Sequence, residues 1–274
     1  MYYFNNHKYI KTKERGKFIM IYREKKIYSG NMLEVEVYPI SLKDRRQSRR
    51  KKEKESLPKQ KRLNDKNSRK HLIRLINTNF SNKDYSVTLT YDNNNLPSDE
   101  EKAKKDVYNY LRRVKRYLKK NDLPSLKYIA VIEYKEQKEN SKAVRIHHHV
   151  IMSGDIPRDK VEEIWGKGRA NADRLQSDEF EFEALGRYIS KDPKGSKRWC
   201  QSKNLKQPVI RVNDFKFSKK KVNELAKSQG DKQAFECIYK GYSYRDYKVE
   251  FNDVIPGTYL YIKMQKLNNR KRRL

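Results

Sequence analysis

The chain has 274 residues, with 66 Lys and Arg against 35 Asp and Glu, so its formal net charge is +31. An excess this large opposes compaction unless a polyanion shares the surface, and nucleic acid is the most common such partner, ahead of an anionic membrane surface. Because 35% of the residues are hydrophobic and 11% are aromatic, the chain can form a folded core, which excludes a purely disordered basic protein.

Several other classes are excluded by missing motifs. No run approaches the roughly 18 apolar residues of a membrane span, and the first residues lack the apolar centre of a secretion signal, so we expect a cytosolic protein without membrane partners. The two cysteines, Cys200 and Cys237, have no CxxC or CxxH spacing, which argues against a disulfide framework or a zinc knuckle. Neither GxxxxGK[ST] nor GxGxxG occurs, so the sequence predicts no ATP-hydrolysing or dinucleotide-binding domain.

Residues 1–80 form a basic region, which we expect to be a helical N-terminal extension. Between Lys43 and Lys70 there are 14 basic and 4 acidic residues. A run of this kind is usually a solvated helix or a flexible arm, and it can also contact phosphates. Its last part, residues 71–80, carries the apolar residues of a packed helix. The candidate DNA contacts in the run are Arg45, Arg46, Arg49, Arg50, Lys51 and Lys52.

A strand and a long helix follow. Residues 85–91 (YSVTLTY) alternate apolar and polar side chains, which predicts a strand. Ser98 precedes Glu101 by three residues, the spacing of a capping box, and the apolar residues that follow share one face of a helix ending near Lys119. Three basic residues outside that apolar stripe, Arg112, Arg113 and Arg116, are further candidate DNA contacts.

The remaining elements complete an α+β pattern. Residues 127–134 and 145–152 read as an antiparallel pair of strands, and residues 158–165 and 178–191 read as helices with a short strand between them. Strands mixed with helices in this order predict an antiparallel sheet with helices packed on it, over residues 81–212. Residues 213–274, with one expected helix and two strands around Pro256-Gly257, would form an accessory segment.

Three consecutive histidines lie in the second of the paired strands. Because side chains alternate along a strand, His147 and His149 share a face and His148 points to the other. Two imidazoles at this spacing can hold a divalent cation, and Glu133, in the middle of the neighbouring apolar strand, is the candidate third ligand. Two alternatives stay open: hydrogen-bonded structural histidines, and an ion pair between Glu133 and Lys127 or Arg145.

The helix predicted at 178–191 carries a second candidate pair. Tyr188 and Lys191 are three residues apart and therefore lie on nearly the same helix face. A tyrosine can attack a phosphodiester, and a nearby ammonium can stabilise the charge that develops. In a chain with 20 Tyr and many Lys, this spacing also arises readily by chance.

Taken in order, VTLTY (87–91), IHHHVIM (146–152) and RYISK (187–191) resemble the three motifs of the HUH endonuclease superfamily. Within it, they are most similar to the rolling-circle replication initiators of small single-stranded DNA phages (microviruses), prophages and plasmids of bacteria. WGKG (165–168), KHLIRLINTNF (70–80) and SKNLKQP (202–208) extend the resemblance to roughly residues 60–215. His148 is a departure, because the family usually has a bulky hydrophobic residue at this middle position; whether His148 packs beneath the sheet in its place stays open.

The resemblance implies a fold, a site and a reaction. The fold would be that of HUH endonucleases, a central antiparallel sheet of about five strands flanked by helices. His147, His149 and Glu133 would hold Mn²⁺ or Mg²⁺, Tyr188 would be the nucleophile, and Lys191 would support it. The protein would nick and rejoin single-stranded DNA at a replication origin through a 5′-phosphotyrosine, working with host helicase and polymerase in the bacterial cytoplasm.

Three competing functions share some of these features. A relaxase usually has its nucleophile before the histidines, whereas Tyr188 follows them, and single-tyrosine transposases are usually shorter and less basic. A non-catalytic nucleic-acid-binding protein would explain the charge and the tyrosines equally well. It would not explain why the histidine triplet, the strand glutamate and the tyrosine helix occur in this order.

Overall fold

A computed structural model describes residues 20–41, 58–135, 144–191, 199–252 and 256–267. Contacts divide the chain into two compact units, each with a sheet and helices, so the α+β class is confirmed. The unit that we call the central unit comprises Tyr28–Met32 and Glu55–Val209. The unit that we call the terminal unit comprises Met1–Ile27, Leu33–Lys54 and Ile210–Leu274.

The described residues of the central unit form a five-stranded sheet in the order β6-β3-β5-β4-β7. Every neighbouring pair in it is antiparallel, including the predicted pair β4 and β5. The strands are β3 (Tyr85–Thr90), β4 (Tyr128–Lys135), β5 (Val144–Met152), β6 (Ala170–Arg174) and β7 (Cys200–Gln201). The three longest strands, β3, β4 and β5, lie where the sequence predicts them, at 85–91, 127–134 and 145–152.

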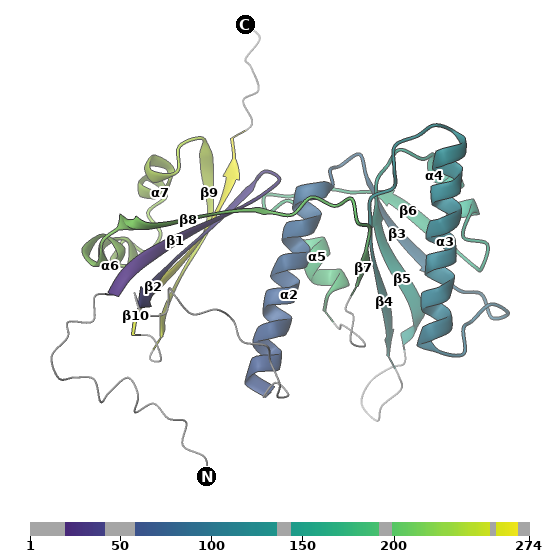
Figure 1. The fold of residues 1–274 in the computed structure, drawn as a ribbon, viewed down its shortest axis with the longest axis horizontal. Coiled ribbons are helices and arrows are strands. Elements are labelled where there is room, and N and C mark those ends of the chain that lie inside the picture. The colour runs from purple at the N-terminus through teal and green to yellow at the C-terminus, as the bar shows by residue number, and fades with distance from the viewer. Residues whose placement is uncertain (1–19, 42–57, 136–143, 192–198, 253–255, 268–274) are drawn as a thin grey trace, which may run out of the picture. The chain divides into compact units, whose positions relative to one another are not determined.

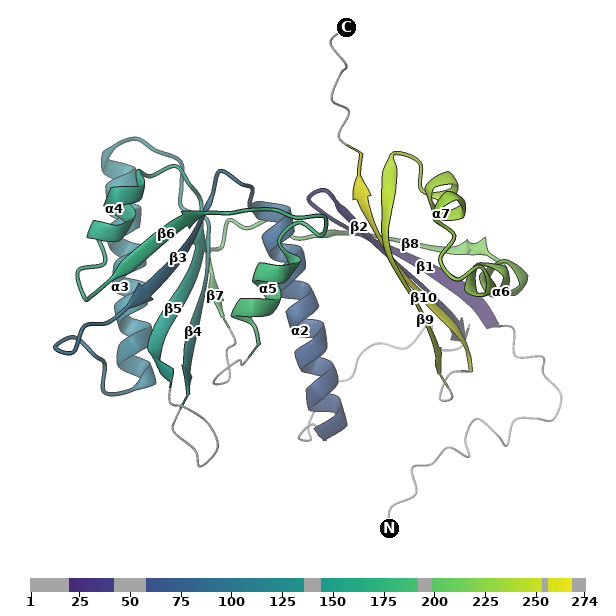
Figure 2. The same ribbon diagram turned by 180° about the vertical axis from the view of Figure 1, so that it is seen from behind.

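Helices cover both faces of this sheet, as the two opposite views show (Figures 1 and 2). One face carries α3 (Glu100–Lys120) and α4 (Arg158–Glu163); the other carries α2 (Pro58–Asn79) and α5 (Glu183–Ile189). Strand alternation separates two cores: Tyr128, Ala130 and Val150 pack towards α3, while Ile129, Val131 and Ile151 pack towards α2 and α5. We call these the α3 face and the α5 face.

Helix α3 confirms the predicted amphipathic pattern, with a different N-cap. Val107, Leu111, Val114 and Leu118 are buried along one side, as their spacing predicts. The capping side chain is Asp99, whose carboxylate accepts from the backbone N–H of Lys102, so the prediction of Ser98 as the cap was wrong by one residue. The Ser98 hydroxyl instead donates to the Asp99 carboxylate.

Helix α5 is shorter than the helix predicted over 178–191. The acidic residues that resemble the first turn of a helix form a separate turn, in which Asp178 and Glu181 pair through their backbones and Glu181 has φ of 58°. The helix begins only at Glu183. Acidic residues favour a helix N-terminus, but Asp also favours turns by bonding nearby N–H groups, as the Asp178 carboxylate does with the N–H of Phe180.

The terminal unit corrects the expectation of a helical N-terminal extension. Part of residues 1–80 is helical, as α2, but β1 (Met20–Ser29) and β2 (Met32–Ser41) are strands. Within the described residues they belong to a five-stranded sheet in the order β8-β1-β2-β10-β9. The other members are β8 (Val209–Phe217), β9 (Tyr242–Asn252) and β10 (Gly257–Lys266), and α6 (Lys219–Lys227) and α7 (Lys232–Ile238) are also in this unit.

The strands of the terminal unit come from two parts of the chain that are far apart in the sequence and share one sheet. Leu33, Val35 and Val37 of β2 are buried, as are Leu260 and Ile262 of β10, the strand beside it. Strands β9 and β10 form the antiparallel pair that the sequence predicts around Pro256-Gly257. In the part of the chain that the structure describes, no helix has the length and apolar character of a membrane span.

Candidate metal centre and nucleophile

The histidine triplet is divided between the two faces of the central sheet. His147 and His149 project to the α5 face, and His148 projects into the core on the α3 face, as alternation predicts. Strand β4 pairs with β5 so that Glu133 lies directly opposite His147. Antiparallel register therefore brings the carboxylate and the two imidazoles together from two strands.

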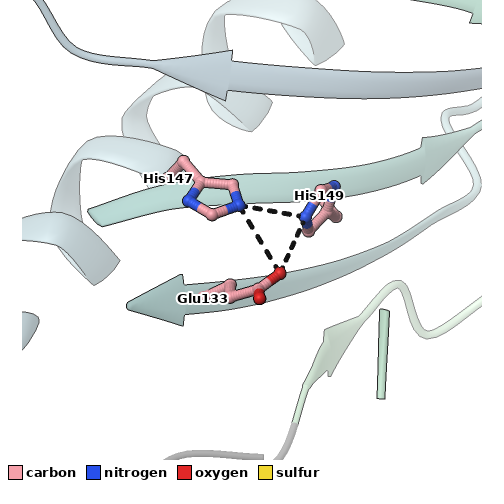
Figure 3. A group of neighbouring side chains, drawn as sticks. All are labelled: Glu133, His147 and His149. Atoms are coloured by element: carbon pink, nitrogen blue, oxygen red, sulfur yellow. Dashed lines mark hydrogen bonds and ion pairs between the residues drawn. The ribbon is translucent and has the colours of Figure 1, made fainter. Parts of the chain in front are cut away.

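Three ligand atoms converge in this cluster (Figure 3). The Nε2 atoms of His147 and His149 are 3.2 Å apart, and the Oε2 atom of Glu133 lies 3.2 Å from Nε2 of His149 and 3.5 Å from Nε2 of His147. A point equidistant from three atoms so spaced is about 1.9 Å from each, close to the roughly 2.0–2.2 Å at which imidazole and carboxylate ligands bind metals. The residues thus fit one divalent cation.

The hydrogen bonds of the cluster prepare His147 as a ligand. Its Nδ1–H donates to the backbone carbonyl of Arg145 at 2.9 Å, which leaves the lone pair of Nε2 directed at the cluster. Burial lowers the pKa of His149, and the neighbouring His147 lowers it further, which favours the neutral form that binds metals. Both imidazoles are therefore suited to coordination.

Glu133 is held as a carboxylate although it is buried. Burial alone would raise its pKa, but the Lys191 ammonium and the two histidines outweigh that effect and lower it. The Nζ of Lys191 lies 3.4 Å from Oε1 of Glu133. Among the described side chains, the ion pairs of Glu133 that the sequence left open, with Lys127 or Arg145, are not formed; the Arg145 guanidinium donates instead to Asn93.

Tyr188 lies beside this cluster. Its ring centre is 5.3 Å from that of His149 in an edge-to-face contact, and the Nζ of Lys191 is 5.1 Å from the ring centre of Tyr188. The tyrosine side chain is half exposed, at 51% of its surface. The structure thus brings together all five residues that the sequence singled out for metal binding and chemistry, with a phenol that is open to solvent.

Two residues of α2 and α5 that the sequence analysis missed hold α5 at this place. Gly186 lets α5 approach α2, because a Cβ atom there would lie 2.6 Å from Cγ1 of Ile73. At the C-terminal end of α5, Arg69 donates to the backbone carbonyl of Ser190. An isolated glycine inside a helical pattern commonly marks close packing, so Gly186 carried a readable signal; nothing local marked Arg69.

His148 is a structural residue on the α3 face. It is fully buried, its Nε2 is 2.8 Å from the hydroxyl of Tyr91, and its ring contacts the ring of Trp165 edge to face. Burial lowers the pKa of His148 to about 3, and the charges of its two neighbours add to this, so it is neutral. Its place is therefore beneath the sheet, and it takes no part in the metal cluster.

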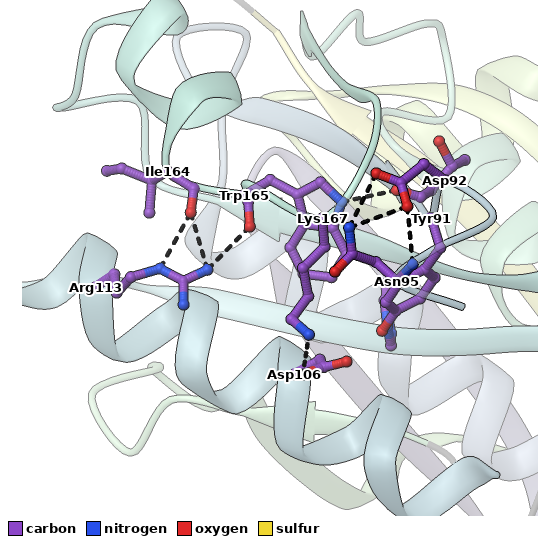
Figure 4. Close-up of polar contacts among 10 residues, drawn as sticks. Tyr91, Asp92, Asn95, Asp106, Arg113, Ile164, Trp165 and Lys167 are labelled. Atoms are coloured by element: carbon purple, nitrogen blue, oxygen red, sulfur yellow. Dashed lines mark hydrogen bonds and ion pairs between the residues drawn. The ribbon is translucent and has the colours of Figure 1, made fainter. Parts of the chain in front are cut away.

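The same core is fixed to α3 by polar contacts around Trp165 (Figure 4). The Arg113 guanidinium donates to the backbone carbonyls of Ile164 and Trp165, and Lys167 forms an ion pair with Asp106 at 3.0 Å. Arg113, a candidate DNA contact, therefore also holds the segment after α4. Arg112 and Arg116 are exposed. The other candidates, Arg45, Arg46, Arg49, Arg50, Lys51 and Lys52, lie outside the described residues.

The fold and the cluster define an α+β protein in which two histidines and a glutamate on an antiparallel sheet lie beside a tyrosine and a lysine. Residues 84–193 match the model of a family of replication-associated proteins. This segment contains all five residues of the cluster and its neighbouring helix. Comparison with curated proteins and with solved structures finds no match. The segment match supports a role in replication.

Proposed function

We propose that the protein is a replication initiator that nicks and rejoins single-stranded DNA at an origin and so starts rolling-circle replication. The observation that carries the proposal is the position of Tyr188 against His149, at the edge of three converging metal ligands. The family match over residues 84–193 supports it independently, because that match points to replication. The HUH endonuclease class is part of the same proposal.

The proposed reaction is a transesterification. The phenolic oxygen of Tyr188 forms a bond to the scissile phosphorus, and the bond from phosphorus to the 3′-oxygen breaks. The phenolic proton leaves to solvent, and the departing 3′-oxygen takes up a proton to become a free hydroxyl. The products are a 5′-phosphotyrosine and a 3′-OH that host polymerase can extend. Because the ester conserves the energy of the bond, the reverse reaction can rejoin the strand without ATP.

Each residue of the cluster has a defined task in this reaction. His147, His149 and Glu133 would hold the divalent cation, which supplies Lewis-acid polarisation of the scissile phosphate. Mixed nitrogen and oxygen ligands suit Mn²⁺ somewhat better than Mg²⁺. The Lys191 ammonium lies between Glu133 and the Tyr188 ring, where it holds the carboxylate ionised and stabilises negative charge on the phenol oxygen or phosphate. We place the protein with host helicase and polymerase in the bacterial cytoplasm.

The decisive experiment looks for the covalent intermediate. The full chain is incubated with Mn²⁺ and single-stranded oligonucleotides that tile its own replicon, and adducts are separated on a denaturing gel. We expect an adduct with the native chain, none with Tyr188→Phe, and an unchanged adduct with the control Tyr117→Phe, whose side chain packs on the core of the α3 face, away from the cluster. An adduct formed by Tyr188→Phe would show that the nucleophile is wrong.

The same gel separates the proposal from its rival. A non-catalytic DNA-binding protein would bind the oligonucleotides and leave no adduct with any variant. Salt sensitivity would not separate the two, because both bind phosphates with a strongly basic chain. Peptide mapping of the adduct identifies the tyrosine directly.

A further inference from the structure

A groove runs along one flank of α3, on the face of the sheet opposite the metal centre. It consists of two adjoining hollows of about 810 Å³ and 730 Å³ that share Lys115 and Tyr128. Tyr128 projects to the α3 face, whereas Glu133 projects to the α5 face, so the sheet itself separates the groove from the cluster. We call it the α3 groove.

Cations predominate among the charged side chains that line the α3 groove. Residues at positions 105, 108, 112, 115 and 119 follow the three- and four-residue spacing of a single helix stripe. Lys203, from the segment after β7, faces the same hollow as Lys115 and Lys119. Within the described part of the chain, six of its cations have no ion pair with a carboxylate, whereas Lys104 is paired with Glu100 and Glu101. The six are Lys102, Lys105, Arg112, Lys115, Lys119 and Lys203.

Among the described residues, the six cations without an ion pair set the α3 groove apart from a solvent-exposed helix face on which opposite charges are paired. Like charges three or four residues apart on a helix destabilise it, and opposite charges at these spacings stabilise it. In the α3 groove the carboxylates lie near the two ends of α3, at Asp99, Glu101 and Asp122. The middle of the groove is therefore cationic, as a polyanion requires.

One exposed tyrosine, Tyr108, adds a flat surface to this cationic groove, and a second, Tyr128, is buried at its base. Tyr108 is 39% exposed in the wall, and Tyr128 lies below Lys115, whose Nζ is 5.0 Å from its ring centre. Exposed aromatic rings beside phosphate-binding cations are what single-stranded nucleic acid uses, because unstacked bases can stack on them. A duplex keeps its bases stacked on each other and gains nothing from Tyr108.

We propose that the α3 groove is a second DNA site, which binds the sugar–phosphate backbone of single-stranded DNA and stacks a base on Tyr108. This site lies behind the sheet, so strand held there is separate from strand at Tyr188. It would retain one part of the displaced strand while another part is cut or rejoined. The inference goes beyond the nicking proposal, since binding at the groove requires neither the metal cluster nor the nucleophile.

Binding without metal tests the site apart from catalysis. Fluorescence anisotropy of a labelled single-stranded oligonucleotide with the full chain, in EDTA, gives the affinity at several salt concentrations. Replacing Lys105, Arg112 and Lys119 by Gln removes three exposed cations and keeps good helix formers. We expect the slope of log affinity against log salt to fall by about 2, because each lost phosphate contact on a single strand contributes about 0.7.

A matched variant controls for net charge. Lys83→Gln, Lys120→Gln and Lys220→Gln together remove the same charge from exposed positions outside the groove, and we expect the slope to change by less than about 0.5. An equal fall in both triple variants would overturn the proposal, because the cations would then act only through the field of the whole chain.

Tyr108 identifies the form of DNA. Tyr108→Ala is expected to weaken binding of single-stranded DNA roughly fivefold or more, Tyr108→Phe to retain it, and binding of duplex to be unaffected by either change. If duplex binding shows the same dependence on Tyr108, the ligand class is wrong. The tyrosyl adduct of Tyr188 is a separate readout, so failure of the nicking proposal and failure of the groove proposal are distinguishable.

Discussion

Histidines on the two faces of the central sheet have different surroundings. On the α5 face, His147 and His149 direct nitrogen atoms at each other and at a carboxylate, at distances of 3.2 Å and 3.5 Å that suit a cation. On the α3 face, His148 is surrounded by Tyr91 and Trp165 and satisfies one nitrogen with a hydroxyl. Three adjacent identical side chains therefore divide into two candidate ligands and one core residue, because successive side chains of a strand point to opposite faces.

On the α5 face, polar groups are held close together around a place for a cation, whereas on the α3 face a neutral imidazole is enclosed by packed aromatic rings. Two imidazoles and a carboxylate held this closely gain most when a cation lies between them. The core around His148 gains only from packing and hydrogen bonds, and leaves its Nδ1 without a partner within the described residues. Changes on the two faces should thus affect different properties, metal binding on one and folding stability on the other.

The largest expected effect follows from removing both ligands on the α5 face. His147→Ala with His149→Ala leaves Glu133 alone, so Mn²⁺ affinity and adduct formation should each fall more than about 100-fold, beyond the loss typical of supporting residues. Binding is measured by the electron paramagnetic resonance of free Mn²⁺, and adducts on a denaturing gel. Activity that persists in this variant and resists EDTA would end the metal hypothesis.

Changing His148, which lies between them, should lower folding stability and leave metal binding unchanged. His148→Ala removes a buried ring and leaves the Tyr91 hydroxyl without that partner, so the free energy of unfolding should fall by about 2–4 kcal/mol. Below its melting temperature the variant should bind Mn²⁺ about as tightly as the native chain. His148→Phe, which keeps a ring, separates lost volume from the lost hydrogen bond. Loss of Mn²⁺ binding by a folded His148→Ala variant would show that the faces are not independent.

The sequence predicts the site well because its ligands follow local rules. Alternation alone placed His147 and His149 on one face, and an antiparallel pair of strands brought Glu133 opposite His147. The β1 strand was missed because its pattern contains Glu24, a buried carboxylate whose hydrogen-bond partners, Lys216 and Tyr239, are 192 and 215 residues away in sequence. Its local ion pair, with Lys26, is longer, at 3.8 Å. A local pattern does not show the two remote hydrogen bonds that compensate the burial of this carboxylate.

The start of α5 was missed for a related reason. Acidic residues at 178–183 are favourable at a helix N-terminus, and their presence predicts a helix there. Asp178 instead accepts a hydrogen bond from the N–H of Phe180 and forms a turn, so the helix begins later. The contacts that position α5, from Gly186 to Ile73 and from Arg69 to Ser190, join segments that are far apart in the sequence. Sequence patterns therefore identified the residues of the candidate site and left out the residues that hold them in place.

The smallest expected effect tests whether the packing of α5 on α2 sets the position of Tyr188. Gly186→Ala places a methyl group 2.6 Å from Cγ1 of Ile73, so α5 must move from α2 and carry Tyr188 with it. We expect adduct formation to slow about tenfold while Mn²⁺ affinity stays unchanged, because the three ligands lie on β4 and β5. Ile73→Ala in the same chain removes the opposing Cγ1 atom and should restore part of the rate. A matching loss of Mn²⁺ affinity would instead mean that the methyl group disturbs the sheet, and an unchanged rate would mean that the packing of α5 on α2 does not set the position of Tyr188.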